Sequence, residues 1–138
     1  MNSQPLRVPS VSDYIAAFRA IESQINIKQK EILTAHHAAP ARVISATRLA
    51  KDVGFSDYNP VNLQYGRLAG AIARELNIDL GGFVQLGILV DFVHPDFAAN
   101  QHYLWVLRPN VAQALEDLGW VPRNSHLLYP EDAPDPKV

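Results

Sequence analysis

Side chains that can read base edges recur along the segment that begins at Asn59: Asn62, Gln64, Arg67 and Arg74. Asparagine and glutamine amides form paired hydrogen bonds with adenine, and arginine does the same with guanine. If this segment is a helix with one side buried, these four side chains lie on its exposed side. The sequence therefore predicts a nucleic-acid interface on this helix.

The local charge favours an anionic partner only modestly. Between residues 40 and 78, five basic and three acidic side chains give a net charge of +2, whereas the whole chain carries −2 at pH 7. Arg48 and Lys51 precede the helix, where we expect them to contact phosphates. A pI of 6.2 does not indicate a general polyanion binder, so a solvated surface or a protein contact fits the same residues.

Two neighbouring residues of this helix are interpreted structurally. Tyr65 belongs to its apolar stripe, and Gly66 lies in its interior, where glycine costs about 1 kcal/mol relative to alanine. Close packing of another helix against Gly66 would explain that cost. The alternative is a ligand that approaches the backbone there.

The histidines do not form a metal-binding motif. His36 and His37 are adjacent, so on a helix their side chains point roughly 100° apart and cannot easily share an ion. His94, Asp96 and His102 lie around one loop and could converge, but no cysteine or HExxH pattern accompanies them. We expect no metal site, and surface or capping roles for the histidines.

No motif in the chain indicates catalysis. The sequence has no GxSxG, P-loop or GxGxxG pattern, and without cysteine it has no thiol nucleophile or disulfide. Neighbouring acidic pairs such as Glu116-Asp117 are typical of a solvated surface. We expect a non-enzymatic protein without a cofactor.

The helix that carries the candidate site has the clearest signals in the chain. Asn59 is the predicted N-cap, with Pro60 at the first helical position. Apolar side chains follow at helical spacing and predict one continuous buried stripe. These are Val61, Tyr65, Leu68, Ile72 and Leu76.

Periodicity and punctuation by proline and glycine predict a mostly helical α+β domain. Ser12 and Ser45 are predicted N-caps, and Gly54 and Gly119 predicted C-terminal glycines. The expected order is a helix over 12–23, a helix over 26–38, a short helix between Ser45 and Gly54, the helix from Asn59, strands over 86–93 and 103–107, and a helix from Pro109 to Leu118.

This order is that of a winged helix-turn-helix, with the helix from Asn59 as the recognition helix. Its wing is the connection between the strands, flanked or lined by Asp91, His94, Pro95, Asp96, Phe97 and His102. DNA-binding wings usually offer lysine or arginine to phosphates. This wing offers none before Arg108, which favours a protein partner with a basic surface.

Two stretches resemble a module at the N-terminus of some bacterial HNH-endonuclease proteins. They are the run from Ala46 to Leu68, with its Leu-Ala, Val-Gly and Asn-Leu-Gln-Tyr-Gly-Arg-Leu elements, and the run from Leu104 to Trp120. The resemblance spans roughly residues 12–121. It implies a setting in DNA metabolism or bacterial defence. We expect no nuclease part beside this module, so no His-Asn-His metal arrangement carries over.

Length and composition indicate one globular domain. The chain has 138 residues, of which 48% are hydrophobic and 19% charged. We expect a flexible arm over 1–11, a domain over 12–121 and an irregular proline-rich tail over 122–138. The polar N-terminus has no secretory signal and no stretch is apolar enough to span a membrane, so a cytoplasmic location is expected.

Two functional hypotheses remain open from the sequence. The first is a DNA-binding module that uses Asn62, Gln64, Arg67 and Arg74, with Arg48 and Lys51 on phosphates. The second is a protein-binding adaptor, inhibitor, immunity protein or antitoxin that acts through the same helix or the acidic wing. A homodimer is compatible with both, since paired helix-turn-helix units read two half-sites.

Overall fold

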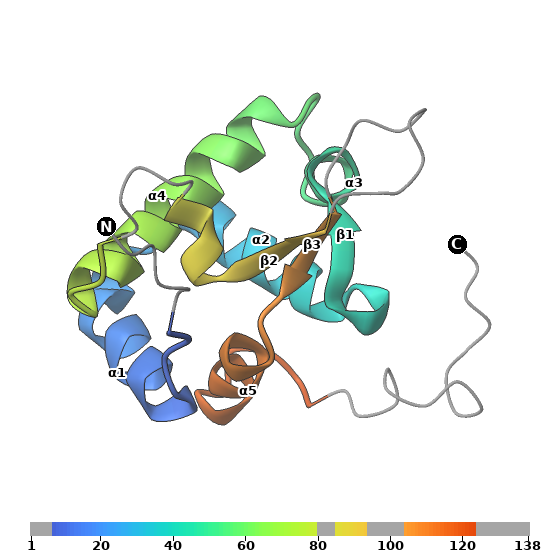
Figure 1. Ribbon diagram of the computed structural model, residues 1–138. Coiled ribbons are helices and arrows are strands. Elements are labelled where there is room, and N and C mark those ends of the chain that lie inside the picture. The colour runs from blue at the N-terminus through green and yellow to red at the C-terminus, as the bar shows by residue number, and fades with distance from the viewer. Residues whose placement is uncertain (1–6, 80–84, 94–103, 124–138) are drawn as a thin grey trace.

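The structure, a computed structural model, describes residues 7–79, 85–93 and 104–123, and most of these are helical (Figure 1). The mostly helical α+β class predicted from the sequence is confirmed. The α-helices are α1 (Val11–Ile21), α2 (Ile27–Ala38), α3 (Ala46–Asp52), α4 (Asn59–Glu75) and α5 (Pro109–Asp117). The 3₁₀ helices are η1 (Glu22–Gln24), η2 (Pro40–Arg42) and η3 (Gln85–Ile88).

A small antiparallel sheet completes the described structure. Its strands are β1 (Val43–Ser45), β2 (Val90–Val93) and β3 (Leu104–Leu107), arranged in the order β1-β3-β2. In the central strand, Trp105 lies opposite Ile44 on one side and Phe92 on the other. Helix α2 lies behind the sheet in the view of Figure 1.

The strand predicted over 86–93 is partly wrong. Its first half forms η3, in which the Leu89 amide donates to the Leu86 carbonyl at 2.9 Å, and β2 begins at Val90. Leu86, Ile88 and Leu89 are all buried. The run of apolar residues therefore reflects their burial and does not indicate a strand. Strand β1 was not predicted, because three residues are too few to show a period.

Helix boundaries follow local capping. Ser10, not the predicted Ser12, caps α1: its hydroxyl accepts from the Asp13 amide, and the Asp13 carboxylate accepts from the Ser10 amide. The predicted cap at Ser45 is confirmed. Asn59 is not the N-cap of α4 as predicted, because it already belongs to the helix, and its amide donates to the carboxylate of Asp57.

The core lies where α4 meets α1, α2, α3 and η3, and α5 packs against α1. Val61, Tyr65, Leu68 and Ile72 of the predicted stripe are buried, and Leu76 is half-buried. Two aromatic residues of α1, Tyr14 and Phe18, are also fully buried. Because one side of α4 is held in this core, its other side is presented outwards.

The two neighbouring histidines of α2 are buried, so the expected surface or capping role was wrong. The Nδ1 atom of His36 accepts from the Tyr65 hydroxyl at 2.7 Å, and its Nε2 lies 3.0 Å from the Trp105 carbonyl oxygen and 3.1 Å from that of Arg42. His37 lies 2.8 Å from the Glu116 carboxylate. Both side chains join α2 to other elements.

The edges of the predicted domain can be described only in part. Residues 1–6 and 124–138 of the predicted arm and tail lie outside the described residues. Pro9 is buried, and its carbonyl accepts from the side-chain amide of Asn110 in α5 at 2.9 Å. Among the described helices, none has both the length and the apolar character needed to cross a membrane.

Candidate nucleic-acid interface

The outward side of α4 carries the predicted base-reading residues but does not gather all of them. Asn62, Arg67 and Arg74 are exposed, whereas Gln64 is half-buried. At roughly 100° per residue, Asn62 and Gln64 lie on opposite edges of the exposed arc. Arg67 and Arg74 lie between these edges, about two turns apart.

Arg67 and Arg74, like Arg7 and Arg19, have no ion pair within the described part of the chain. Arg74 also has its guanidinium near Gly70 and Gln85. By contrast, several other arginines have carboxylate partners within 4 Å. These are Arg42, Arg48, Arg108 and Arg123.

The side chain of Gln64 is held against the start of α2. The Asn26 side-chain nitrogen donates to the Gln64 side-chain oxygen at 3.1 Å, and the Gln29 side-chain nitrogen donates to the Gln64 backbone carbonyl at 3.2 Å. Asn26 and Gln29 also cap α2 reciprocally. Gln64 is therefore less available for a base than the exposed Asn62.

The two predicted phosphate contacts lie on α3. Arg48 pairs with Asp52 one turn away at 3.1 Å, and Lys51 is exposed. The Arg48–Asp52 pair is itself exposed, so it stabilises the helix by less than about 1 kcal/mol and a phosphate could replace the carboxylate. The structure thus divides the six predicted residues between two helices.

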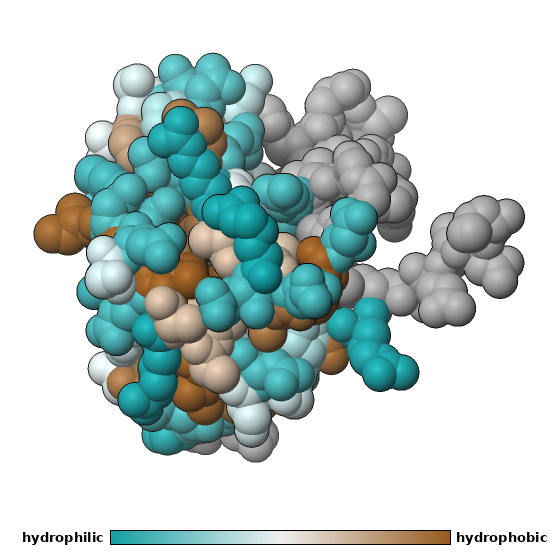
Figure 2. All heavy atoms as spheres, turned by 90° about the vertical axis from the view of Figure 1, so that its left-hand side faces the viewer, coloured by the Kyte–Doolittle hydropathy of each residue, from teal (hydrophilic) through white to brown (hydrophobic). Residues whose placement is uncertain are grey.

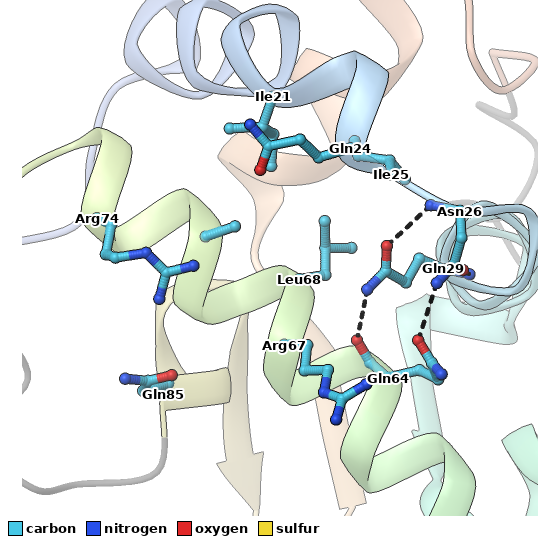
Figure 3. Close-up of a pocket in the computed structure, with 11 residues that line it drawn as sticks. Ile21, Gln24, Ile25, Asn26, Gln29, Gln64, Arg67, Leu68, Arg74 and Gln85 are labelled. Atoms are coloured by element: carbon cyan, nitrogen blue, oxygen red, sulfur yellow. Dashed lines mark hydrogen bonds between the residues drawn. The ribbon is translucent and has the colours of Figure 1, made fainter.

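A groove runs between α4 and the junction of η1 with α2, with a volume of about 420 Å³. Arg67 and Arg74 line it, and its apolar side chains are Ile21, Ile25, Leu68 and Ala71. Figure 3 shows the amides of Asn26, Gln29 and Gln64 linked at one end and Arg74 with Gln85 at the other. The amide side chains that line it are Gln24, Asn26, Gln29, Gln64 and Gln85.

Most of the groove was missed from the sequence. The pattern Asn26-x-x-Gln29 could have been interpreted as a helix N-terminus with a capping box. Its contact with Gln64, 38 residues further on, is tertiary and leaves no local signal.

The glycines of α4 have different surroundings. A Cβ at Gly70 would meet the Gln85 side-chain oxygen, so η3 packs closely there. A Cβ at Gly66 would meet nothing within 4 Å, so the expected packing of another helix against Gly66 was wrong. Gly66 opens directly onto the outward side of α4.

The wing supplies little positive charge within the described residues. Arg108, the first cation after the wing, donates through Nε and one terminal nitrogen to the Gly87 carbonyl and lies 3.5 Å from Asp91. Its side chain is 13% exposed, so it serves the fold. The remaining wing residues, His94, Pro95, Asp96, Phe97 and His102, lie outside the described residues.

Within 7–79, 85–93 and 104–123, no group of three histidine, aspartate or glutamate side chains is placed to hold a metal ion. Among the sites described above, the groove is the one where polar and charged side chains are most concentrated. Neither family models, nor curated proteins, nor solved structures give a match to this chain. The side of the molecule formed by α1 and α4 is mainly hydrophilic, with apolar atoms visible between polar side chains (Figure 2).

Proposed function

We propose that the chain is a non-enzymatic winged helix-turn-helix module of a DNA-acting or bacterial defence system, and that α4 contacts duplex DNA. The observation that carries the proposal is the pair Arg67 and Arg74, exposed on the outward side of α4 without an ion pair in the described residues. An unpaired guanidinium exchanges only water for a phosphate or guanine, whereas a paired one must first give up its carboxylate.

The connectivity supports the winged-helix assignment. Helices α3 and α4 are joined by the turn over 53–58, and the antiparallel strands β2 and β3 follow α4. Strand β1 precedes α3 and pairs with β3, which ties the helix pair to the sheet. In such a module the second helix of the pair enters the major groove.

The positions of the side chains favour different roles. Asn62 lies in the first turn of α4 and Arg67 at its middle, and both are assigned to base edges. Arg74, in the last turn of α4, and Lys51, in the last turn of α3, are assigned to phosphates, with Arg48 after exchange of Asp52. Gln64 has a lesser role because Asn26 already occupies its side-chain oxygen.

The test is a fluorescence-anisotropy titration of labelled duplex DNA with the wild-type protein and an Arg67→Ala, Arg74→Ala variant. Each lost phosphate or base contact should cost about 1–3 kcal/mol, so the double variant should bind at least about thirtyfold more weakly. The matched control is Arg7→Ala, Arg19→Ala. It removes the same charge from exposed arginines outside α3 and α4, and we expect a much smaller loss.

An equal loss in the control and in the α4 variant would show that net charge, rather than α4, determines binding. Absence of binding by the wild-type protein at low salt would contradict the proposal outright.

A second candidate function is protein binding through the same helix. Leu63 is 51% exposed on the outward side of α4, next to Asn62 and beside Gly66 in space. A leucine at the centre of a polar face suits the apolar core of a protein interface. If DNA does not bind, a partner captured by the wild-type protein and not by Leu63→Ser would support this adaptor or inhibitor role.

A further inference from the structure

The groove between α4 and the η1–α2 junction combines three kinds of side chain that suit one class of small ligand. Its volume of about 420 Å³ falls within the range of about 300–1,000 Å³ that is usual for small-molecule sites. We propose that this groove binds a mononucleotide, with the phosphate at Arg67 and Arg74, the body over the apolar side chains and the base edge toward the amides.

The cationic side of the groove determines the charge of the ligand. Arg67 and Arg74 both line it, and no aspartate or glutamate is among its lining residues. Neither arginine has an ion pair within the described residues. Guanidinium groups bind phosphate through two parallel hydrogen bonds, and no acidic lining residue would repel the phosphate.

The amides of Asn26, Gln29 and Gln64, beside Arg67 and at the opposite end of the groove from Arg74, provide a fixed surface for hydrogen bonding. Asn26, Gln29 and Gln64 are connected by hydrogen bonds of 2.8–3.2 Å, so their positions are set before a ligand binds (Figure 3). Preorganised groups lose less conformational entropy on binding. Gln24 and Gln85 have exposed amides without a hydrogen-bonding partner among the described residues, so each can still donate and accept.

A nucleotide matches this combination of arginines, amides and apolar side chains. A nucleobase presents donors and acceptors on one edge, which amide side chains can satisfy in pairs. Its ring is flat and largely apolar on its faces, and Ile25, Leu68 and Ile21 supply apolar contacts in the groove. Inorganic phosphate would use only the arginines and leave the amides and apolar side chains without a contact.

The nucleotide site does not require that α4 binds DNA, although it shares Arg67 and Arg74 with the proposed function. If both hold, a bound nucleotide and duplex DNA compete for the same two guanidinium groups. A mononucleotide would then release the protein from DNA, because one ligand cannot bind without displacing the other from these arginines.

The test is to titrate the full chain separately with adenosine monophosphate, inorganic phosphate and adenosine. Two-dimensional amide NMR monitors each titration. Adenosine monophosphate should shift amides of η1, the start of α2 and α4 in a saturable manner. Phosphate and adenosine should each bind at least about tenfold more weakly than adenosine monophosphate, because each lacks one half of the contacts. A single-stranded oligonucleotide tests whether the nucleotide is free or part of a strand.

Three variants make the assignment specific. Arg67→Ala should weaken nucleotide binding about tenfold or more, and Gln24→Ala should weaken it without touching α4. Asn62→Ala, on the opposite edge of α4, should leave nucleotide binding unchanged and weaken DNA binding. Nucleotide binding that persists in a protein without DNA affinity supports this site and contradicts the proposed function alone.

Two outcomes would overturn the nucleotide site. One is no saturable shift with adenosine monophosphate at millimolar concentration. The other is equal affinity for inorganic phosphate and adenosine monophosphate, which would show that the amides and apolar side chains contribute nothing. Normal DNA binding alongside either outcome would leave the proposed function intact.

Discussion

Gly66 lies in the interior of α4 with open space beside its Cα, and this makes it the least expected residue on the outward face. Alanine would fit there and would favour the helix by about 1 kcal/mol. Neither packing nor a positive φ angle requires glycine at this position. A DNA backbone or base edge that approaches α4 closely between Asn62 and Arg67 would account for it.

The substitution Gly66→Ala should therefore have opposite effects on stability and on binding. Urea denaturation should show stabilisation by about 1 kcal/mol, because alanine restricts the unfolded chain and meets no atom within 4 Å. Anisotropy should show weaker DNA binding, because the added methyl group keeps the ligand from the backbone.

The control is Gly119→Ala, at a glycine that also has open space but a φ of +77°. It should lose stability by about 1 kcal/mol, because alanine is strained in the left-handed region. Unchanged DNA affinity in Gly66→Ala would contradict close approach at this residue.

At the scale of elements, α4 is positioned by helices and turns that are remote in sequence. The Tyr14 hydroxyl of α1 donates to the Ile88 carbonyl at the end of η3, at 2.6 Å. Both groups are buried, and burial raises the pKa of Tyr14 to about 12. This bond fixes α1 to η3, and both elements pack against α4.

Removal of that hydroxyl should loosen this junction. Tyr14→Phe should lower the free energy of unfolding by about 2 kcal/mol, because the buried Ile88 carbonyl loses its donor while the ring still fills its place. Urea denaturation measures the loss. Hydrogen exchange at the Leu89 amide, which is bonded to Leu86 in the η3 turn, should become faster. An unchanged denaturation midpoint would contradict the role given to this bond.

Elements with long periodic patterns were predictable from the sequence, whereas short ones were not. The buried stripe of α4 repeats over four turns, and its period alone separated Arg67 and Arg74 from the core. Strand β1 and η3 have three and four residues, and their conformation depends on pairing with β3 and packing on α4. The sequence predicted the exposed side chains of α4 that line one wall of the groove, but not the groove itself. The other wall, at Asn26 and Gln29, is brought there only by folding.

The whole molecule links its stability to pH through buried histidines. Burial lowers the pKa of His36 to about 4, although hydrogen bonds to the Trp105 and Arg42 carbonyls oppose that shift. Burial also lowers the pKa of His37, against the effect of its bond to Glu116. In the unfolded chain both rings take up protons near pH 6.5.

Acid should therefore destabilise the fold over a defined interval. The unfolded state binds more protons than the folded state between pH 6.5 and about 4, so stability falls as pH decreases through this window. For His36 the loss between about pH 7 and pH 5 is about 2 kcal/mol. Urea denaturation at both values should show it.

The variant His36→Gln should show a smaller pH dependence than the wild-type protein, whatever its absolute stability. An equally steep loss in the variant would assign the acid effect to other groups.

The salt dependence of duplex DNA binding by the wild-type protein shows directly whether α4 lies on DNA. Between about 50 and about 200 mM salt, release of counterions from several neutralised phosphates should weaken binding by an order of magnitude or more. That loss, reduced in slope when Arg67 and Arg74 are replaced by alanine, is the result expected if α4 lies on DNA. Absence of binding at the lower salt concentration, or an affinity that salt does not change, would contradict the account and direct attention to a protein partner on the same helix.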